Sequence, residues 1–103
     1  MDKRTTNSIK KYVSSVAQNY PNFVTAYVFG SFAKNKQGKD SDIDIAIVID
    51  NLPDSEKFDK QVQCMIIASN FDTRIEPHVL SRQDLITDNP FVYEIIKTGI
   101  EIK

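Results

Sequence analysis

The segment 42–50 constrains the fold of this chain more than any other segment. Isoleucine stands at every second position within it, as Ile43, Ile45, Ile47 and Ile49. Successive side chains of a β-strand point to opposite faces of a sheet, so these four isoleucines share one face. The alternation therefore predicts a strand over 42–50 whose isoleucine face is buried against a core.

The other segments predict a small mixed β-sheet flanked by helices, a fold of the α+β class with an α/β-like order of elements. Helical spacing of apolar residues, strand-forming runs and turn residues set the boundaries. The expected elements are a helix over 6–19, a strand over 23–29, a loop over 34–41, a helix from 54 or 55 to 69, a strand over 74–80, a helical turn over 81–84, a helix over 90–97 stopped by Gly99, and an edge strand over 100–102.

The first two helices are each expected to bury an apolar stripe. Residues three or four positions apart lie on one side of a helix, and an apolar stripe of this kind usually faces the core. For the helix over 6–19 the stripe includes Ile9, Tyr12, Val13 and Val16. For the helix that starts at 54 or 55 it is Phe58, Val62, Met65 and Ile66.

Length and charge limit the classes of protein to which the chain can belong. Its 103 residues suffice for one domain, which we expect to span residues 1–103. The net charge is −1, so no overall basic field attracts nucleic acid, and we expect no direct contact with it. The single cysteine, Cys64, lies in an apolar helical stretch and is expected in the core.

Membrane insertion is not expected. The longest apolar run, 45–49, is far shorter than the ~20 residues of a transmembrane helix. The first residues lead into an amphipathic segment without the hydrophobic core of a signal peptide. We therefore expect a cytoplasmic protein.

Two short motifs suggest phosphate chemistry. Asp42 and Asp44 are two positions apart on the predicted strand, so their carboxylates point the same way and repel each other unless a cation neutralises them. Hard divalent ions such as Mg²⁺ prefer oxygen ligands of this kind. Gly30-Ser31, expected to open a short helix, offers backbone N–H groups and a hydroxyl to a phosphate. A phosphate-binding turn beside a metal-binding pair indicates phosphoryl or nucleotidyl transfer.

The combination Phe29-Gly30-Ser31, ten residues, then Asp42-Ile43-Asp44-Ile45 resembles the signature of the nucleotidyltransferase superfamily that includes DNA polymerase beta. The short length resembles the minimal nucleotidyltransferases, many of which are antitoxins paired with HEPN-domain ribonuclease toxins. The resemblance implies the polymerase beta-type nucleotidyltransferase fold. It also implies transfer of AMP from ATP to a hydroxyl of a partner protein, here a HEPN toxin.

The family has a third carboxylate on a later strand, for which Asp72 and Glu76 are candidates. Glu76 is favoured because it lies in the middle of the strand over 74–80. By the resemblance, Asp42, Asp44 and Glu76 would be catalytic and would hold two Mg²⁺ ions on the phosphates of ATP. Gly30 and Ser31 would contact the triphosphate.

Charged residues near these motifs have two interpretations each. Lys34, Lys36 and Lys39 could meet phosphate charge or simply be solvated in their loop. Arg74 and His78 share the strand face of Glu76, so either could contact substrate or steady the third carboxylate. For His78 a structural role is the favoured interpretation.

Two other functions remain open. The chain could neutralise a partner by contact alone, as a non-catalytic antitoxin-type binding module. It could also be the catalytic subunit of a small-molecule nucleotidyltransferase that modifies an antibiotic. Because a domain of this length buries little of a nucleotide, the acceptor surface is expected from a partner or a second copy, in a hetero- or homo-oligomer.

Overall fold

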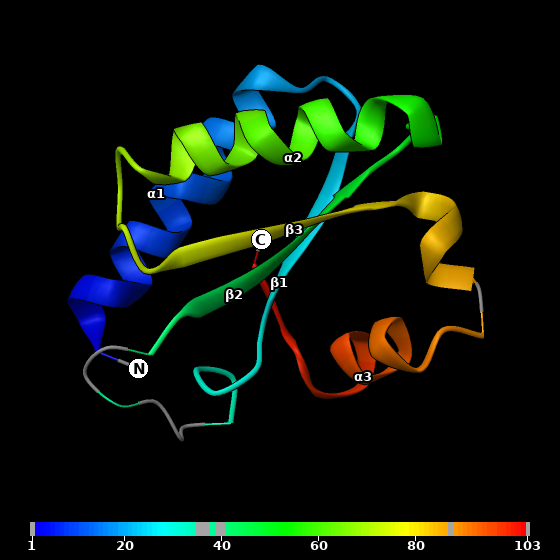
Figure 1. Ribbon diagram of the computed structural model, residues 1–103. Coiled ribbons are helices and arrows are strands. Elements are labelled where there is room, and N and C mark those ends of the chain that lie inside the picture. The colour runs from blue at the N-terminus through cyan, green and yellow to red at the C-terminus, as the bar shows by residue number, and fades with distance from the viewer. Residues whose placement is uncertain (1, 35–37, 39–40, 87, 103) are drawn as a thin grey trace.

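Helices and strands follow one another in the predicted order (Figure 1). The computed structural model describes residues 2–34, 38, 41–86 and 88–102. Within them no helix is long and apolar enough to cross a membrane. The elements are α1 (Lys3–Asn19), β1 (Phe23–Phe29), β2 (Ile43–Ile49), α2 (Asp54–Ala68), β3 (Ile75–Ser81), the 3₁₀ helix η1 (Arg82–Ile86), α3 (Pro90–Thr98) and β4 (Ile100–Ile102).

Most boundaries lie within a residue or two of the prediction. The bounds of β1 are those predicted, whereas β2 lacks the first and last residues of the predicted strand, so Asp42 and Asp50 flank it. Helix α1 begins at Lys3 rather than at Thr6 because the Asp2 carboxylate accepts a hydrogen bond of 2.7 Å from the Thr5 N–H. Most of the predicted loop over 34–41 lies outside the described residues.

The four strands form one mixed sheet in the order β3-β2-β1-β4, which confirms the predicted fold class. Strand β2 runs parallel to β3 and antiparallel to β1. The register sets Asp44 beside Phe29 of β1 on one side and beside Glu76 of β3 on the other. The sheet therefore gathers the end of β1 and the starts of β2 and β3 at one place.

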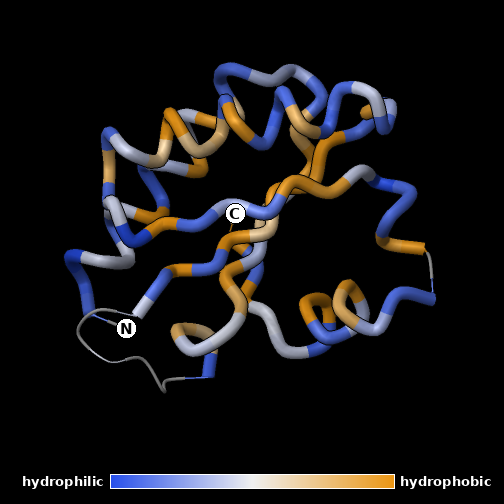
Figure 2. Tube along the Cα trace, in the orientation of Figure 1, coloured by the Kyte–Doolittle hydropathy of each residue, from blue (hydrophilic) through white to orange (hydrophobic). Residues whose placement is uncertain are grey.

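The two faces of the sheet are covered differently. We call the face with Ile43, Ile45, Ile47 and Ile49 the closed face. It packs against α1 and α2, which lie on the same side of the sheet in Figure 1, and it forms the larger core cluster. The hydrophobic colour of Figure 2 follows the strands where they cross at the centre of the molecule.

The opposite face, which we call the open face, carries Phe29, Asp44, Glu76 and His78. Helix α3 lies on this side (Figure 1), and its Ile95 forms a small cluster with Phe29 and Ala46. Asp44 and His78 are half-buried and Glu76 is exposed. Polar side chains at the Asp44 end of the open face therefore remain accessible.

The predicted buried stripe of α2 is wrong. Phe58, Val62, Met65 and Ile66 are all exposed, by 76%, 38%, 53% and 62%. The side of α2 that meets the rest of the molecule carries the small side chains of Cys64 and Ala68, both buried.

The Gln61 side chain explains this orientation of α2. Its amide donates to the Pro77 carbonyl (2.6 Å) and accepts from the Val79 N–H (2.9 Å). Strand β3 is at an edge of the sheet, where backbone groups lack a neighbouring strand. The amide of Gln61 supplies the missing partner, and this requires the side of α2 that carries Gln61, Cys64 and Ala68 to face β3.

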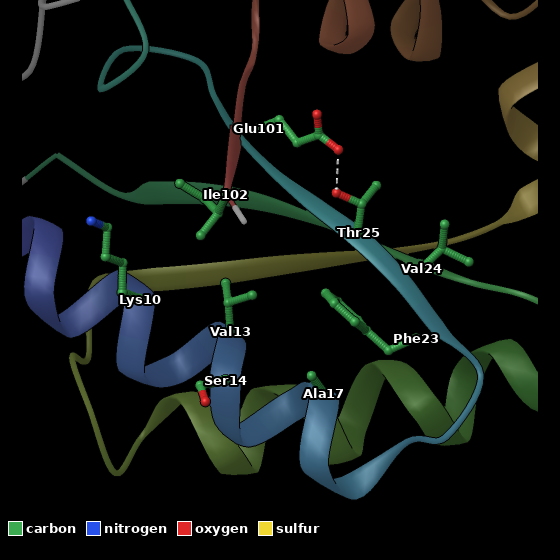
Figure 3. Close-up of a pocket in the computed structure, with 9 residues that line it drawn as sticks. All are labelled: Lys10, Val13, Ser14, Ala17, Phe23, Val24, Thr25, Glu101 and Ile102. Carbon is green, nitrogen blue, oxygen red and sulfur yellow. Dashed lines mark hydrogen bonds between the residues drawn. The ribbon is translucent and has the colours of Figure 1, made fainter.

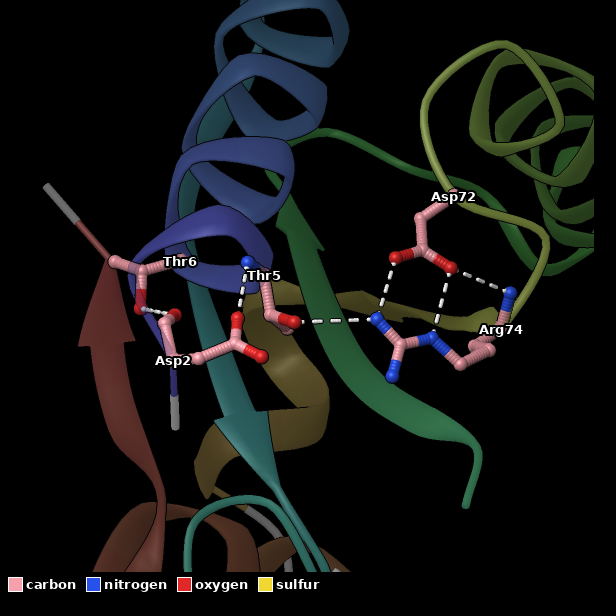
Figure 4. Close-up of polar contacts among 5 residues, drawn as sticks. All are labelled: Asp2, Thr5, Thr6, Asp72 and Arg74. Carbon is pink, nitrogen blue, oxygen red and sulfur yellow. Dashed lines mark hydrogen bonds and ion pairs between the residues drawn. The ribbon is translucent and has the colours of Figure 1, made fainter. Parts of the chain in front are cut away.

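Arg74 joins the start of β3 to the start of α1 (Figure 4). Its guanidinium donates to both carboxylate oxygens of Asp72 (3.1 and 2.8 Å) and to the Thr5 hydroxyl (3.1 Å). The Arg74 backbone N–H also donates to Asp72 (2.9 Å). These bonds hold the pKa of the Asp72 carboxyl below its ordinary value. We call this group the Arg74 clamp.

Candidate active site

The turn after β1 places its backbone directly against Asp44. Gly30 has φ +73°, a left-handed conformation that favours glycine. A Cβ atom at this position would lie 2.7 Å from Oδ2 of Asp44, so only glycine leaves room for the carboxylate. The predicted phosphate-binding turn and the second aspartate of the motif are therefore neighbours in space.

The expected short helix after Gly30 does not form in the described residues. Residues 30–34 are a turn, closed by a hydrogen bond from the Lys34 N–H to the Gly30 carbonyl (3.2 Å). Ser31 lies half-buried within this turn. Any anion bound here would meet the N–H groups of a single turn and the Ser31 hydroxyl.

Asp44 and Glu76 meet across the parallel pair of strands. They are register partners, and their carboxylates form a group with His78 in which one potential ligand atom from each lies within 4.8 Å of the others. Asp42 is exposed, precedes β2, and is not part of this group. Of the predicted site residues, the structure thus brings together Gly30, Asp44 and Glu76, with Ser31 in the same turn as Gly30. Asp42 lies just before β2 and outside the group with His78.

His78 joins the carboxylates through its ring. Its Nε2 lies 3.2 Å from Oδ1 of Asp44. Behind the imidazole stand Phe29, with ring centroids 5.1 Å apart, and Phe91, at 6.0 Å. Sequence reasoning favoured a structural role for this residue, although its spacing of two from Glu76 on one strand was a signal that both share a face.

The alternative third carboxylate, Asp72, is engaged elsewhere. It belongs to the Arg74 clamp, which also places the Arg74 guanidinium at Asp72 and Thr5. Lys34 is exposed and lies 3.9 Å from Glu94 of α3, and Lys36 and Lys39 lie outside the described residues. Among the described residues considered as third carboxylate, Glu76 is the one beside Asp44.

The donor set is suitable for a divalent cation. Two carboxylates from adjacent strands are held side by side, which is costly without a neutralising charge. Carboxylate oxygens suit hard ions such as Mg²⁺ and Mn²⁺, and an imidazole nitrogen is also a common metal ligand. Asp44, Glu76 and His78 therefore fit a divalent ion.

Several grooves of the described surface lie away from these residues. One of about 510 Å³ opens between α1, β1 and β4 and is lined by residues such as Lys10, Phe23 and Ile102 (Figure 3). A smaller groove of about 210 Å³ runs from the end of α2 to β3 and is lined by Met65, Asp72 and Glu76 among others. The smaller one thus runs from the exposed Met65 of α2 to Glu76.

Solved structures with a similar fold include two kinds of protein. One is a protein from Sulfolobus solfataricus provisionally identified as a nucleotidyltransferase, which is 24% identical with a TM-score of 0.64; the match covers 98% of this chain and 87% of that one. Another is a toxin–antitoxin complex with AMP-PNP, 19% identical, with a TM-score of 0.61, covering 89% and 70%. At these identities the likeness shows the fold alone.

A third similar structure is the toxin–antitoxin pair MntA-HpeT carrying two aspartate-to-glutamate mutations. It is 17% identical with a TM-score of 0.59, covering 89% of this chain and 70% of that one. No curated protein matches the sequence.

The family described as "Polymerase beta, Nucleotidyltransferase" matches residues 11–103, nearly the whole chain. This match, on a mixed sheet that sets Gly30, Asp44 and Glu76 side by side, shows that the chain belongs to the polymerase beta nucleotidyltransferase family.

Proposed function

We propose that this chain transfers AMP from ATP to a hydroxyl of a partner protein, with divalent metal ions bound at Asp42, Asp44 and Glu76. The observation that carries the proposal is the position of the Asp44 carboxylate. It lies between the Gly30 turn, where a Cβ would reach it at 2.7 Å, and Glu76, its partner in the strand register. A phosphate group bound at the turn would therefore stand beside the metal-binding carboxylates.

Each residue has a role in this reaction. The turn at Gly30 lets the backbone approach the triphosphate closely, and the Ser31 hydroxyl donates to a phosphate oxygen. The oxygen of the acceptor hydroxyl attacks the α-phosphorus, the bond from that phosphorus to the bridging oxygen breaks, and pyrophosphate leaves. Glu76 accepts the proton of the attacking hydroxyl. Two Mg²⁺ ions held by the three carboxylates would supply charge neutralisation for the entering and leaving oxygens.

A protein acceptor is favoured by the surface of α2. Exposed apolar side chains that gather in one patch often mark a site of interaction with another protein. Phe58, Met65 and Ile66 form such a group, and one groove is lined by both Met65 and Glu76. A partner docked on α2 would therefore lie close to the site of transfer.

The structural neighbours suggest which partner this is. Two of them are toxin–antitoxin complexes, one with the ATP analogue AMP-PNP and one with two aspartates replaced. By this likeness and by the sequence resemblance, we take the partner to be a HEPN-domain toxin that is inactivated by the modification, in the cytoplasm. The same likeness and resemblance are the reasons for proposing ATP as the donor of AMP.

Transfer of radioactive label from ATP labelled at the α-phosphate tests the proposal. The purified chain, Mg²⁺ and the protein that co-purifies with it from its native cells should yield a labelled partner, and Asp44→Asn or Asp42→Asn should abolish the label. Asp50→Asn is the matched control, because Asp50 flanks the other end of β2. Equal labelling by Asp44→Asn and the unmodified chain would contradict the metal role of Asp44.

Contact alone is the second candidate function, and the exposed apolar group on α2 favours it, because docking there needs no chemistry. Under that function the partner is neutralised equally well by Asp44→Asn, and it stays unlabelled with every nucleoside triphosphate. Under the transfer function, Asp44→Asn still binds the partner but does not neutralise it. A growth assay with both proteins expressed distinguishes the two.

A further inference from the structure

We propose that His78 is a protein ligand of the metal ion at Asp44 and Glu76, and that it makes this site prefer Mn²⁺ to Mg²⁺. The inference rests on the proposed function in one respect, that Asp44 and Glu76 are metal ligands. It adds a nitrogen ligand to a set that the sequence resemblance describes with carboxylates alone.

The spacing of the atoms carries the first step. In an octahedral site with bonds of about 2.1 Å, adjacent ligand atoms are about 3.0 Å apart and opposite ones about 4.2 Å. Nε2 of His78 and Oδ1 of Asp44 are 3.2 Å apart, and one atom from each of the three residues lies within 4.8 Å of the others. An ion therefore fits among them with small side-chain movements.

The orientation of the imidazole carries the second step. Phe29 packs against the ring edge to face at 5.1 Å and 62°, and Phe91 lies 6.0 Å away. The two phenyl rings also contact each other, at 5.6 Å and 82°. These contacts support the imidazole on its apolar side, while its Nε2 meets the carboxylate oxygen. The ring is thus held in place by residues that do not themselves bind metal.

The strand geometry carries the third step. Glu76 and His78 are two residues apart on β3, so both project from the open face, and β2 places Asp44 opposite Glu76. His78 lies opposite Ala46, whose small side chain leaves space beside Asp44 on the same face. The imidazole can therefore approach Asp44 from the next position along the sheet.

The chemistry of the ligands sets the preference. Mg²⁺ binds carboxylate oxygens and keeps several waters, whereas imidazole nitrogen is a better ligand for first-row transition ions. Mn²⁺ accepts both kinds of ligand. A site with two carboxylates and one imidazole should bind Mn²⁺ more tightly than Mg²⁺, and loss of the imidazole should reduce that difference.

The test uses Mn²⁺ alone, without nucleotide or partner, and the chain with any purification tag removed. His78 is the only histidine of the chain, so imidazole ¹⁴N coupling to bound Mn²⁺ in pulsed electron paramagnetic resonance has a single source. We expect this coupling in the unmodified protein and its loss in His78→Gln. Calorimetry should show Mn²⁺ affinity about tenfold weaker in His78→Gln, with Mg²⁺ affinity little changed.

Two results would overturn the inference in distinguishable ways. If Mn²⁺ binds without ¹⁴N coupling and His78→Gln binds it equally well, His78 only donates a hydrogen bond to Asp44, while the proposed function stands. If Asp44→Asn also binds Mn²⁺ as tightly as the unmodified chain, both the ligand role of His78 and the metal site of the proposed function fail. Asp50→Asn, at the other end of β2, is a control that leaves the imidazole and its supporting rings in place, and it should retain the coupling.

Discussion

The alternation of side chains along the strands gives the sheet a closed face that is buried and an open face that stays partly accessible. On the closed face, Ile43, Ile45 and Ile47 are fully buried against α1 and α2. On the open face, Asp44, Glu76 and His78 stand at the same end of the same strands and stay partly accessible. Strand β2 thus anchors the fold with one set of side chains and presents the candidate site with the other. Stability and chemistry should therefore respond to different substitutions.

The largest expected effect is on the closed face. Ile47→Ala removes a side chain with no exposure at the centre of the sheet, and the resulting cavity should lower the free energy of unfolding by about 2–5 kcal/mol. Urea denaturation followed by circular dichroism measures this loss. Ile96→Ala on α3, which is 43% exposed, is the matched control and should change stability by less than about 0.5–1 kcal/mol. If Ile47→Ala and Ile96→Ala lowered the free energy of unfolding equally, the closed face would not be the part of the sheet that stabilises the fold.

A smaller effect is expected where β1 ends beside the site. Gly30→Ala puts an ordinary side chain at φ +73° and a Cβ against the Asp44 carboxylate, so stability should fall by about 1–2 kcal/mol and Asp44 should be displaced. Gly38→Ala is the control, because a Cβ there would lie 3.7 Å from its nearest neighbour, Ser41 Oγ. Denaturation together with nucleotide binding checks both effects. Unchanged nucleotide binding by Gly30→Ala would speak against the turn as the phosphate site.

The Arg74 clamp should contribute less, and in a pH-dependent way. The pKa of Asp72 is lowered in the folded state, so its contribution is present above the pKa of the unfolded chain and is lost as the pH falls through the folded value. Asp72→Asn should cost at most about 1 kcal/mol at pH 7, and this cost should shrink below about pH 4. Denaturation at both pH values measures it, with Asp59→Asn on α2 as control. A cost that is constant with pH would contradict the clamp.

The smallest effect on stability is expected on α2. Phe58→Ser and Ile66→Ser alter side chains that are 76% and 62% exposed, so the free energy of unfolding should change by only about 0.5 kcal/mol. Their effect should instead appear in capture of the partner protein. A loss of several kcal/mol from either substitution would mean that these residues belong to the core after all, as their spacing in the sequence predicts.

The elements were predictable because their local signals agree with the sheet. The alternation of 43–49 defined the central strand, Pro90 and Gly99 bracketed the last helix, and β1 has the predicted bounds. Helix α2 shows the limit of such reasoning. An apolar stripe distinguishes one side of a helix from the rest, and that side was predicted to be buried. It does not reveal that Gln61 bonds to the edge of β3 and so turns a different side of α2 inward.

The candidate site was predictable in part for the same reason. The spacing of two residues places Glu76 and His78 on one face of β3, and a parallel pairing with β2 brings Asp44 to them. The pairing register itself, and the Phe29 and Phe91 rings behind His78, come from contacts between segments far apart in the sequence. Asp42 is exposed and immediately precedes β2, so its expected role beside Asp44 stays a prediction.

Paramagnetic broadening of amide signals tests the central claim most directly, that the open face at the Gly30 turn binds both metal and nucleotide. Nuclear magnetic resonance spectra of the ¹⁵N-labelled chain would be recorded with AMP-PNP and a small proportion of Mn²⁺. We predict that the amides of Gly30, Ser31, Asp44 and Glu76 broaden first, while those of α1 behind the closed face remain sharp. Broadening that is as strong in α1 as at Gly30 and Asp44 would contradict the account.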